Sequence, residues 1–68
     1  MFTVDARRIR ALMFERGIAG VSALARAAQL NALTVSKVLK DGSTATAKTI
    51  AALARFFGVN GEDLILKG

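Results

Sequence analysis

The sequence predicts an all-α fold. Thirteen of the 68 residues are alanine, the residue with the highest intrinsic helix propensity, and proline is absent. In several segments the apolar residues also recur at the three- and four-residue spacing of one helix face. A chain of this length can form one domain at most, so we expect residues 1–68 to fold as a single unit of five short helices.

The first two predicted helices are bounded by a cap and a glycine. Asp5 can cap the N-terminus of a helix that continues to Arg16, and Gly17 can end it. A short loop over residues 17–20 then leads to a second helix over 21–28. Inward-facing residues at helical spacing are Ile9, Leu12 and Met13 in the first helix, and Val21, Leu24, Ala25 and Ala28 in the second.

The third predicted helix begins almost at once after the second. Asn31 offers an N-cap side chain for a helix over residues 32–40, in which Val35, Val38 and Leu39 point one way. Because Gln29 and Leu30 leave so short a connection, the two helices must cross steeply and the later one must project. The spacing therefore predicts a helix-turn-helix.

The remaining residues predict one longer helix and a final turn. Residues 41–44 have loop chemistry, Thr46 can cap the fourth helix, and Gly58 can end it. Its apolar stripe comprises Ile50, Leu53, Ala54 and Phe57. Residues 60–63 then cap a last helical turn that carries Leu64.

The composition favours a nucleic-acid-binding protein over an enzyme. The chain lacks cysteine and histidine, which excludes disulfides, thiolate metal sites and imidazole bases, and we assign no catalytic residue, metal or cofactor. A net charge of +5 attracts polyanions. The longest uncharged run, residues 27–36, is half the roughly 20 residues that a membrane span needs. No signal-peptide pattern follows Met1, so we expect a cytoplasmic protein without membrane contact.

The stretch from Leu24 to Val38, LARAAQLNALTVSKV, resembles the lambda-repressor-like, Cro/CI-type (XRE) helix-turn-helix family. The resemblance extends to residues 9–18 and to residues 49–64, so it covers nearly the whole chain. Three features depart from the family pattern. Gln29 replaces the usual turn glycine, the segment from Lys40 to Gly42 is one residue longer, and Phe56 replaces a typically small residue.

The resemblance implies that the start of the third helix reads DNA bases in the major groove. The positions that it assigns to base edges or to the rim of the groove are Asn31, Ala32, Leu33, Thr34, Ser36 and Lys37. Lys37 can donate to guanine O6 or N7, and Leu33 offers methyl groups that suit the thymine methyl. We therefore predict a thymine opposite Leu33.

Phosphate contacts are expected on either side of that helix. The amides at the start of the second helix favour an anion, and nearby hydroxyls and cations can add to them. The predicted phosphate contacts are Val21, Ser22, Lys40, Ser43, Thr44 and Lys48.

Gln29 stands where the family usually has a turn glycine. For a glutamine at position 29, a left-handed backbone would cost on the order of 1 kcal/mol relative to glycine.

One domain of this size touches few base pairs, so recognition predicts a homodimer on half-sites about 34 Å apart. The residues considered for the dimer interface are Phe14, Phe56, Ile65 and Leu66. The resemblance implies a transcriptional regulator, most often a repressor, of phage, mobile-element or bacterial type. Two alternatives stay open: an antitoxin-like protein-interaction module of the same fold, and a non-specific RNA or nucleoid binder.

Overall fold

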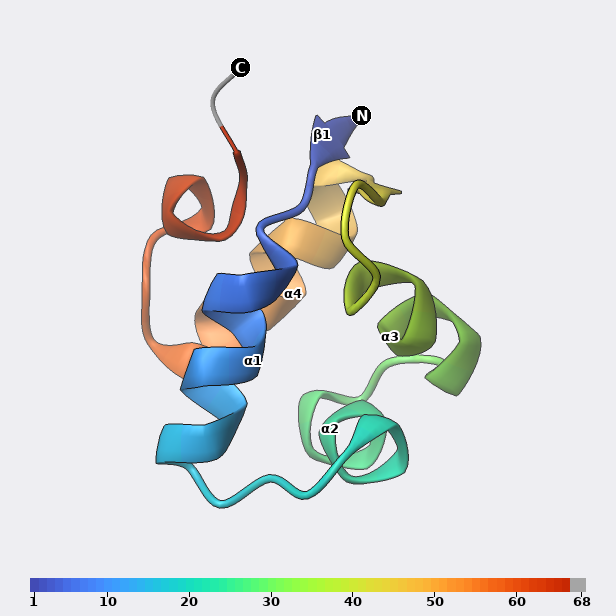
Figure 1. Ribbon diagram of the computed structural model, residues 1–68, viewed down its shortest axis with the longest axis vertical. Helices are drawn as coiled ribbons and strands as arrows, with labels where there is room; N and C mark the ends of the chain where they lie inside the picture. The colour runs from blue at the N-terminus through green and yellow to red at the C-terminus, as the bar shows by residue number, and fades with distance from the viewer. Residues whose placement is uncertain (67–68) are drawn as a thin grey trace.

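The computed structural model describes residues 1–66 and shows four α-helices around one core (Figure 1). They are α1 (Ala6–Glu15), α2 (Val21–Ala28), α3 (Ala32–Val38) and α4 (Ala47–Phe57). The expected fifth helix is a single 3-10 turn, η1 (Gly61–Leu64), so the predicted count of five α-helices is wrong by one. The turn begins at a capping box of Asn60 and Asp63 and ends because Ile65 is extended, with φ −120° and ψ 148°.

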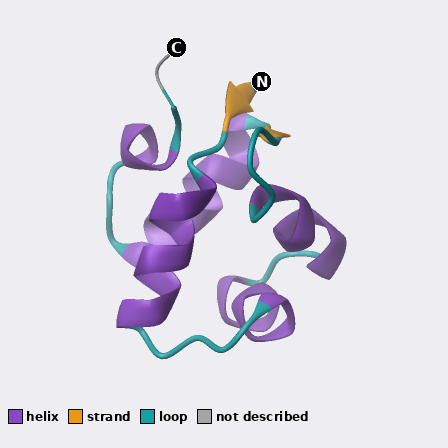
Figure 2. Ribbon diagram, viewed as in Figure 1, coloured by secondary structure: helices purple, strands orange, loops and turns teal. Residues whose placement is uncertain are grey.

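Two short strands were not predicted. β1 (Phe2–Thr3) pairs antiparallel with β2 (Thr44–Ala45), with Phe2 opposite Ala45 (Figure 2). On the other side of β1, the Leu66 amide donates to the Thr3 carbonyl over 2.8 Å. A strand of two residues is too short to show the alternation that marks strands in a sequence, which is why the pattern predicted only a loop before Thr46.

The predicted caps are confirmed at the start of α1 and of α4. The Asp5 side chain accepts from the Arg8 amide, and the Thr46 side chain accepts from the Thr49 amide. Gly17 follows α1 with φ +68°, and Gly58 ends α4 with φ +70°. Such left-handed C-terminal residues are strained for any side chain and easy for glycine.

α3 ends at Val38, two residues before the predicted end at residue 40. The chain tightens there, because the Lys40 amide donates to the Lys37 carbonyl and the Ser43 amide donates to the Lys40 carbonyl. Gly42 completes the reversal with φ +78°. The extra length of this segment is taken up by the turn rather than by the helix.

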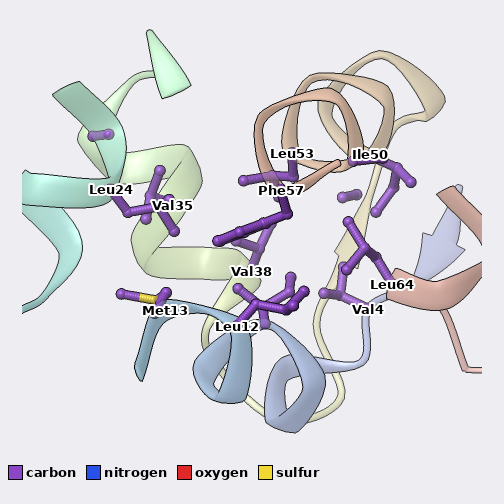
Figure 3. Close-up of a cluster of buried hydrophobic side chains, with 14 residues drawn as sticks. Val4, Leu12, Met13, Leu24, Val35, Val38, Ile50, Leu53, Phe57 and Leu64 are labelled. Carbon is purple, nitrogen blue, oxygen red and sulfur yellow. The ribbon is translucent and has the colours of Figure 1, made fainter. Parts of the chain in front are cut away.

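The core joins side chains from every helix (Figure 3). Leu24 of α2, Val35 and Val38 of α3 and Leu53 of α4 are at most 1% exposed. Completely buried side chains of this kind contribute about 1.5–3 kcal/mol each through the hydrophobic effect. The inner face of α3 is therefore fixed by the core, which leaves its opposite face for solvent or a ligand.

Candidate nucleic-acid interface

The corner between α2 and α3 is tight, as the sequence predicted. α2 ends at Ala28, and Gln29 adopts the left-handed conformation with φ 58° and ψ 45°. Gln29 is the only non-glycine residue with positive φ among residues 1–66. The Leu30 amide then donates back to the Ala25 carbonyl over 2.8 Å, which closes the end of α2. Ala25 is 6% exposed, so the small side chain allows the close packing of the two helices.

α3 presents the predicted reading face to the outside. Asn31, Ala32, Leu33 and Lys37 are exposed, and Leu33 keeps 73% of its surface in contact with solvent. Thr34 and Ser36 are half-buried at the edges of this face. A leucine so exposed on a helix whose valines are buried is available for an apolar contact with another molecule. We call Asn31, Ala32, Leu33, Thr34, Ser36 and Lys37 the α3 face.

Asn31 has a structural role in addition to its place on the α3 face. Its side-chain oxygen accepts from the Leu33 amide over 2.7 Å, which caps α3. The amide group of an asparagine side chain also carries two N–H donors, and these are not part of the cap. Asn31 can therefore keep its capping bond while it donates to a phosphate or a base.

The end of α3 is held by a contact that the sequence did not reveal. Arg10 of α1 donates from Nη1 to the Leu39 carbonyl over 2.6 Å and from Nη2 to Asp41 Oδ1 over 3.2 Å. The contacts between Arg10 and residues 39–41 cross 29 positions or more of the sequence, and no local pattern indicates such a pairing. These two bonds also engage a guanidinium that would otherwise be free to bind a phosphate.

Most of the predicted phosphate contacts lie on the surface. Ser22, Lys40, Thr44 and Lys48 are exposed, and Val21 is half-buried at the start of α2. The N-cap of α2 is a glycine, so no side chain satisfies the first amides of this helix. Free N–H groups at a helix N-terminus attract anions such as phosphate.

Ser43 differs from the other predicted phosphate contacts. Its Oγ is buried and has no hydrogen-bond partner, the one such side-chain atom in the described part of the chain. From this rotamer the hydroxyl cannot touch a phosphate. An unsatisfied buried hydroxyl costs about 1–3 kcal/mol, so rotation of the side chain toward an acceptor outside would be favourable.

A shallow hollow of about 220 Å³ lies beside the α3 face. Thr34 and Lys37 line one side of it, and Thr46 and Thr49 from the start of α4 line the other. The sequence indicates a capping role for Thr46 and carries no local signal for a role of Thr49 in binding. Hydroxyls and an ammonium group around a hollow match the oxygens of a sugar-phosphate backbone.

The four residues considered for dimerisation differ in their exposure. Phe14 is 86% exposed on α1 and Leu66 is 52% exposed. Phe56 is half-buried, and its ring centroid lies 5.0 Å from the ring centroid of Phe57. The Arg16 guanidinium lies 5.8 Å from the Phe56 ring centroid. Ile65 is half-buried and bridges to Val4.

A tight corner, a short second helix and an exposed α3 face together define a helix-turn-helix DNA-binding domain. Residues 8–66 match the family model for the Cro/C1-type HTH DNA-binding domain, and the chain belongs to this family. The family resemblance seen in the sequence is thereby confirmed, and the protein is a DNA-binding regulatory protein. No curated protein and no solved structure matches the chain. Within residues 1–66, no helix has the length and apolar character to cross a membrane.

Proposed function

We propose that the protein is a transcriptional repressor that places α3 in the major groove of a two-fold-related operator and binds it as a dimer. The observation that carries the proposal is the division of α3 into two faces: Val35 and Val38 are at most 1% exposed, whereas Leu33 is 73% exposed. The core thus fixes the helix, and the outward side chains meet the bases. Repression needs only that the bound protein occupies DNA that the polymerase requires.

Two residues of the α3 face carry most of the base specificity. Lys37 donates to O6 or N7 of a guanine, and Leu33 packs on the methyl group of a thymine. Asn31, Ala32, Thr34 and Ser36 complete the contact at its edges. The charges of Lys40 and Lys48, together with the amides at the start of α2, bind phosphates and set the register of the helix in the groove.

The test selects bound duplexes from a random DNA pool and then measures the affinity of variants for the selected site. Lys37→Ala should lose preference at one base pair, at a cost of about 1–3 kcal/mol. Lys48→Ala is the matched control, because it removes the same charge outside the α3 face. It should weaken all duplexes alike and make the slope of log K against log salt shallower by about 0.9.

The proposal fails if no duplex sequence is enriched, or if Lys37→Ala and Lys48→Ala weaken every duplex equally.

The exposure of Leu33 and Phe14 also favours a second candidate function, a protein-interaction module of the same fold. In that case Leu33→Ala would abolish binding of a protein partner while the protein shows no preference among DNA sequences. The pool selection therefore separates the two functions.

A further inference from the structure

An apolar groove of about 310 Å³ lies between α1 and the helix-turn-helix, above the loop that joins α1 to α2 at the lower edge of Figure 1. We call it the α1 groove, and it is lined mainly by Arg10, Met13, Phe14, Ile18, Val21 and Leu39. We propose that the α1 groove binds an acidic segment of a partner protein, and that this segment and DNA exclude each other. The exclusion rests on the proposed function, in which the start of α2 contacts a phosphate.

The apolar side chains of the groove suit a protein segment better than a small molecule. Phe14 stands at the rim with 86% of its surface exposed, and Ile18, Val21 and Leu39 are half-buried. An aromatic side chain held out by a helix is typical of the residues that dominate a protein interface. The same exposure shows that the groove is open, whereas small-molecule sites enclose most of the ligand surface.

The charges around the groove select an acidic partner. Within residues 1–66, no acidic residue lines the α1 groove, and Arg10 is its one charged residue. Arg7 precedes Phe14 by two helical turns, so its exposed guanidinium lies on the same face of α1, and the exposed Lys40 follows the end of α3. Asp41 offsets one of these three charges. Carboxylates complement this rim, whereas a second copy of a chain with net charge +5 does not.

The α1 groove overlaps the proposed DNA interface at the start of α2. Val21 lines the groove and is also a predicted phosphate contact, and the N-cap Gly20 leaves the first amides of α2 without a side-chain partner. A carboxylate beside Val21 therefore takes the place of a phosphate. A carboxylate that draws Arg10 away from Asp41 and from the Leu39 carbonyl also removes the contact that holds the end of α3. Both effects weaken DNA binding.

The size of the groove predicts a partner segment that is short and moderately bound. Eight residues line the groove, whereas a standard interface takes about 20–30 residues from each side. We therefore expect a dissociation constant in about the micromolar range for an isolated peptide. An affinity of this order is measurable without DNA, which keeps the test of the groove separate from the test of the proposed function.

The probe is a library of random peptides displayed on phage and selected on the immobilised protein. The enriched peptides should combine acidic with large apolar residues, and calorimetry then measures the affinity of the most enriched peptide without DNA. Phe14→Ala should weaken its binding at least about tenfold. Leu33→Ala is the matched control, because it removes a similarly exposed apolar side chain from the α3 face, and it should bind the peptide like the wild type. Both side chains lie outside the core, so both variants fold.

A second pair of variants tests the charge of the rim. Arg7→Gln should weaken peptide binding roughly two- to fivefold. Arg55→Gln makes the same charge change on the exposed side of α4, outside the groove, and should have no effect. When the acids of the peptide are replaced by their amides, the wild type and Arg7→Gln should bind it equally, since the pairing partner is gone.

Competition with DNA is measured on a duplex that carries a single half-site, so that association of two copies does not enter. The peptide should displace the wild type from this duplex. Phe14→Ala should bind the duplex like the wild type, and the same peptide concentration should leave it bound.

The inference is overturned if no peptide is enriched, if the enriched peptides lack acidic residues, or if Leu33→Ala weakens peptide binding as much as Phe14→Ala. It is also overturned if saturating peptide leaves the wild type on the duplex. A failure of the proposed function gives a different result, because no duplex sequence is then enriched while the peptide affinities still decide on the groove.

Discussion

Replacing Gln29 with glycine should stabilise the protein. Gln29 is the only residue other than glycine with positive φ among residues 1–66, and its exposed side chain makes no hydrogen bond that the substitution would remove. A left-handed backbone costs an L-residue about 1–2 kcal/mol, and glycine avoids this cost. The greater conformational freedom of glycine in the unfolded chain offsets about 0.5–1 kcal/mol of the stability gained. The net increase in the free energy of unfolding is about 0.5–1 kcal/mol.

Thermal and urea denaturation measure this increase. In a domain of this size, Tm rises by about 4–8 °C for each kcal/mol, so we expect a shift of about 2–8 °C at an unchanged urea m-value. Gln29→Ala is the matched control, because it removes the polar side chain but keeps the Cβ that causes the strain. It should differ little from the wild type.

Gly58→Ala should act in the opposite direction. Gly58 has φ +70°, and an added Cβ would meet nothing within 4 Å, so any loss of stability comes from the backbone alone. We expect a loss of about 1 kcal/mol. The reasoning is refuted if Gln29→Gly is no more stable than Gln29→Ala, since the strain would then not lie in the backbone of the turn.

Three further substitutions test the contacts that hold the helices. Val35→Ala should lower the free energy of unfolding by about 2 kcal/mol, because it empties part of a fully buried site beneath α3; a urea titration measures it. Arg16→Ala should cost about 1–2 kcal/mol in the same assay, since Arg16 donates to the Phe57 carbonyl over 2.8 Å; an effect equal to that of exposed Arg7→Ala would contradict this role. Arg10→Ala should cost about 0.5–1 kcal/mol and weaken DNA binding a few-fold, because it frees the end of α3. An unchanged affinity for DNA would show that the contact does not position the helix.

Local features of the chain could be predicted from the sequence. The N-cap at Asn31 and the buried valines of α3 follow from spacing and from residue chemistry within a few positions, and the structure confirms both. The left-handed backbone at Gln29 follows from the family resemblance, which places a turn glycine there, and the structure confirms it as well. The outward direction of Leu33 follows from the same spacing, because a helix that buries Val35 and Val38 must expose the opposite side.

Contacts between distant segments could not be predicted in this way. β1 and β2 have two residues each, and their pairing joins Phe2 to Ala45 across most of the chain. The bond from Arg10 to the end of α3 also depends on the three-dimensional packing of α1. Phe56 was considered for the dimer interface, and the Arg16 guanidinium lies 5.8 Å from its ring centroid, a contact that no local pattern indicates.

The segment that follows β1 is hydrogen-bonded both to the middle of the chain and to the residues near its C-terminal turn η1. The Val4 amide donates to the Ser43 carbonyl over 2.9 Å, and the Asp5 amide donates to the Leu64 carbonyl over 2.8 Å. Neither bond can open without separating the beginning of the chain from its middle or from its end. These two amides should therefore exchange with deuterium only when the whole molecule unfolds.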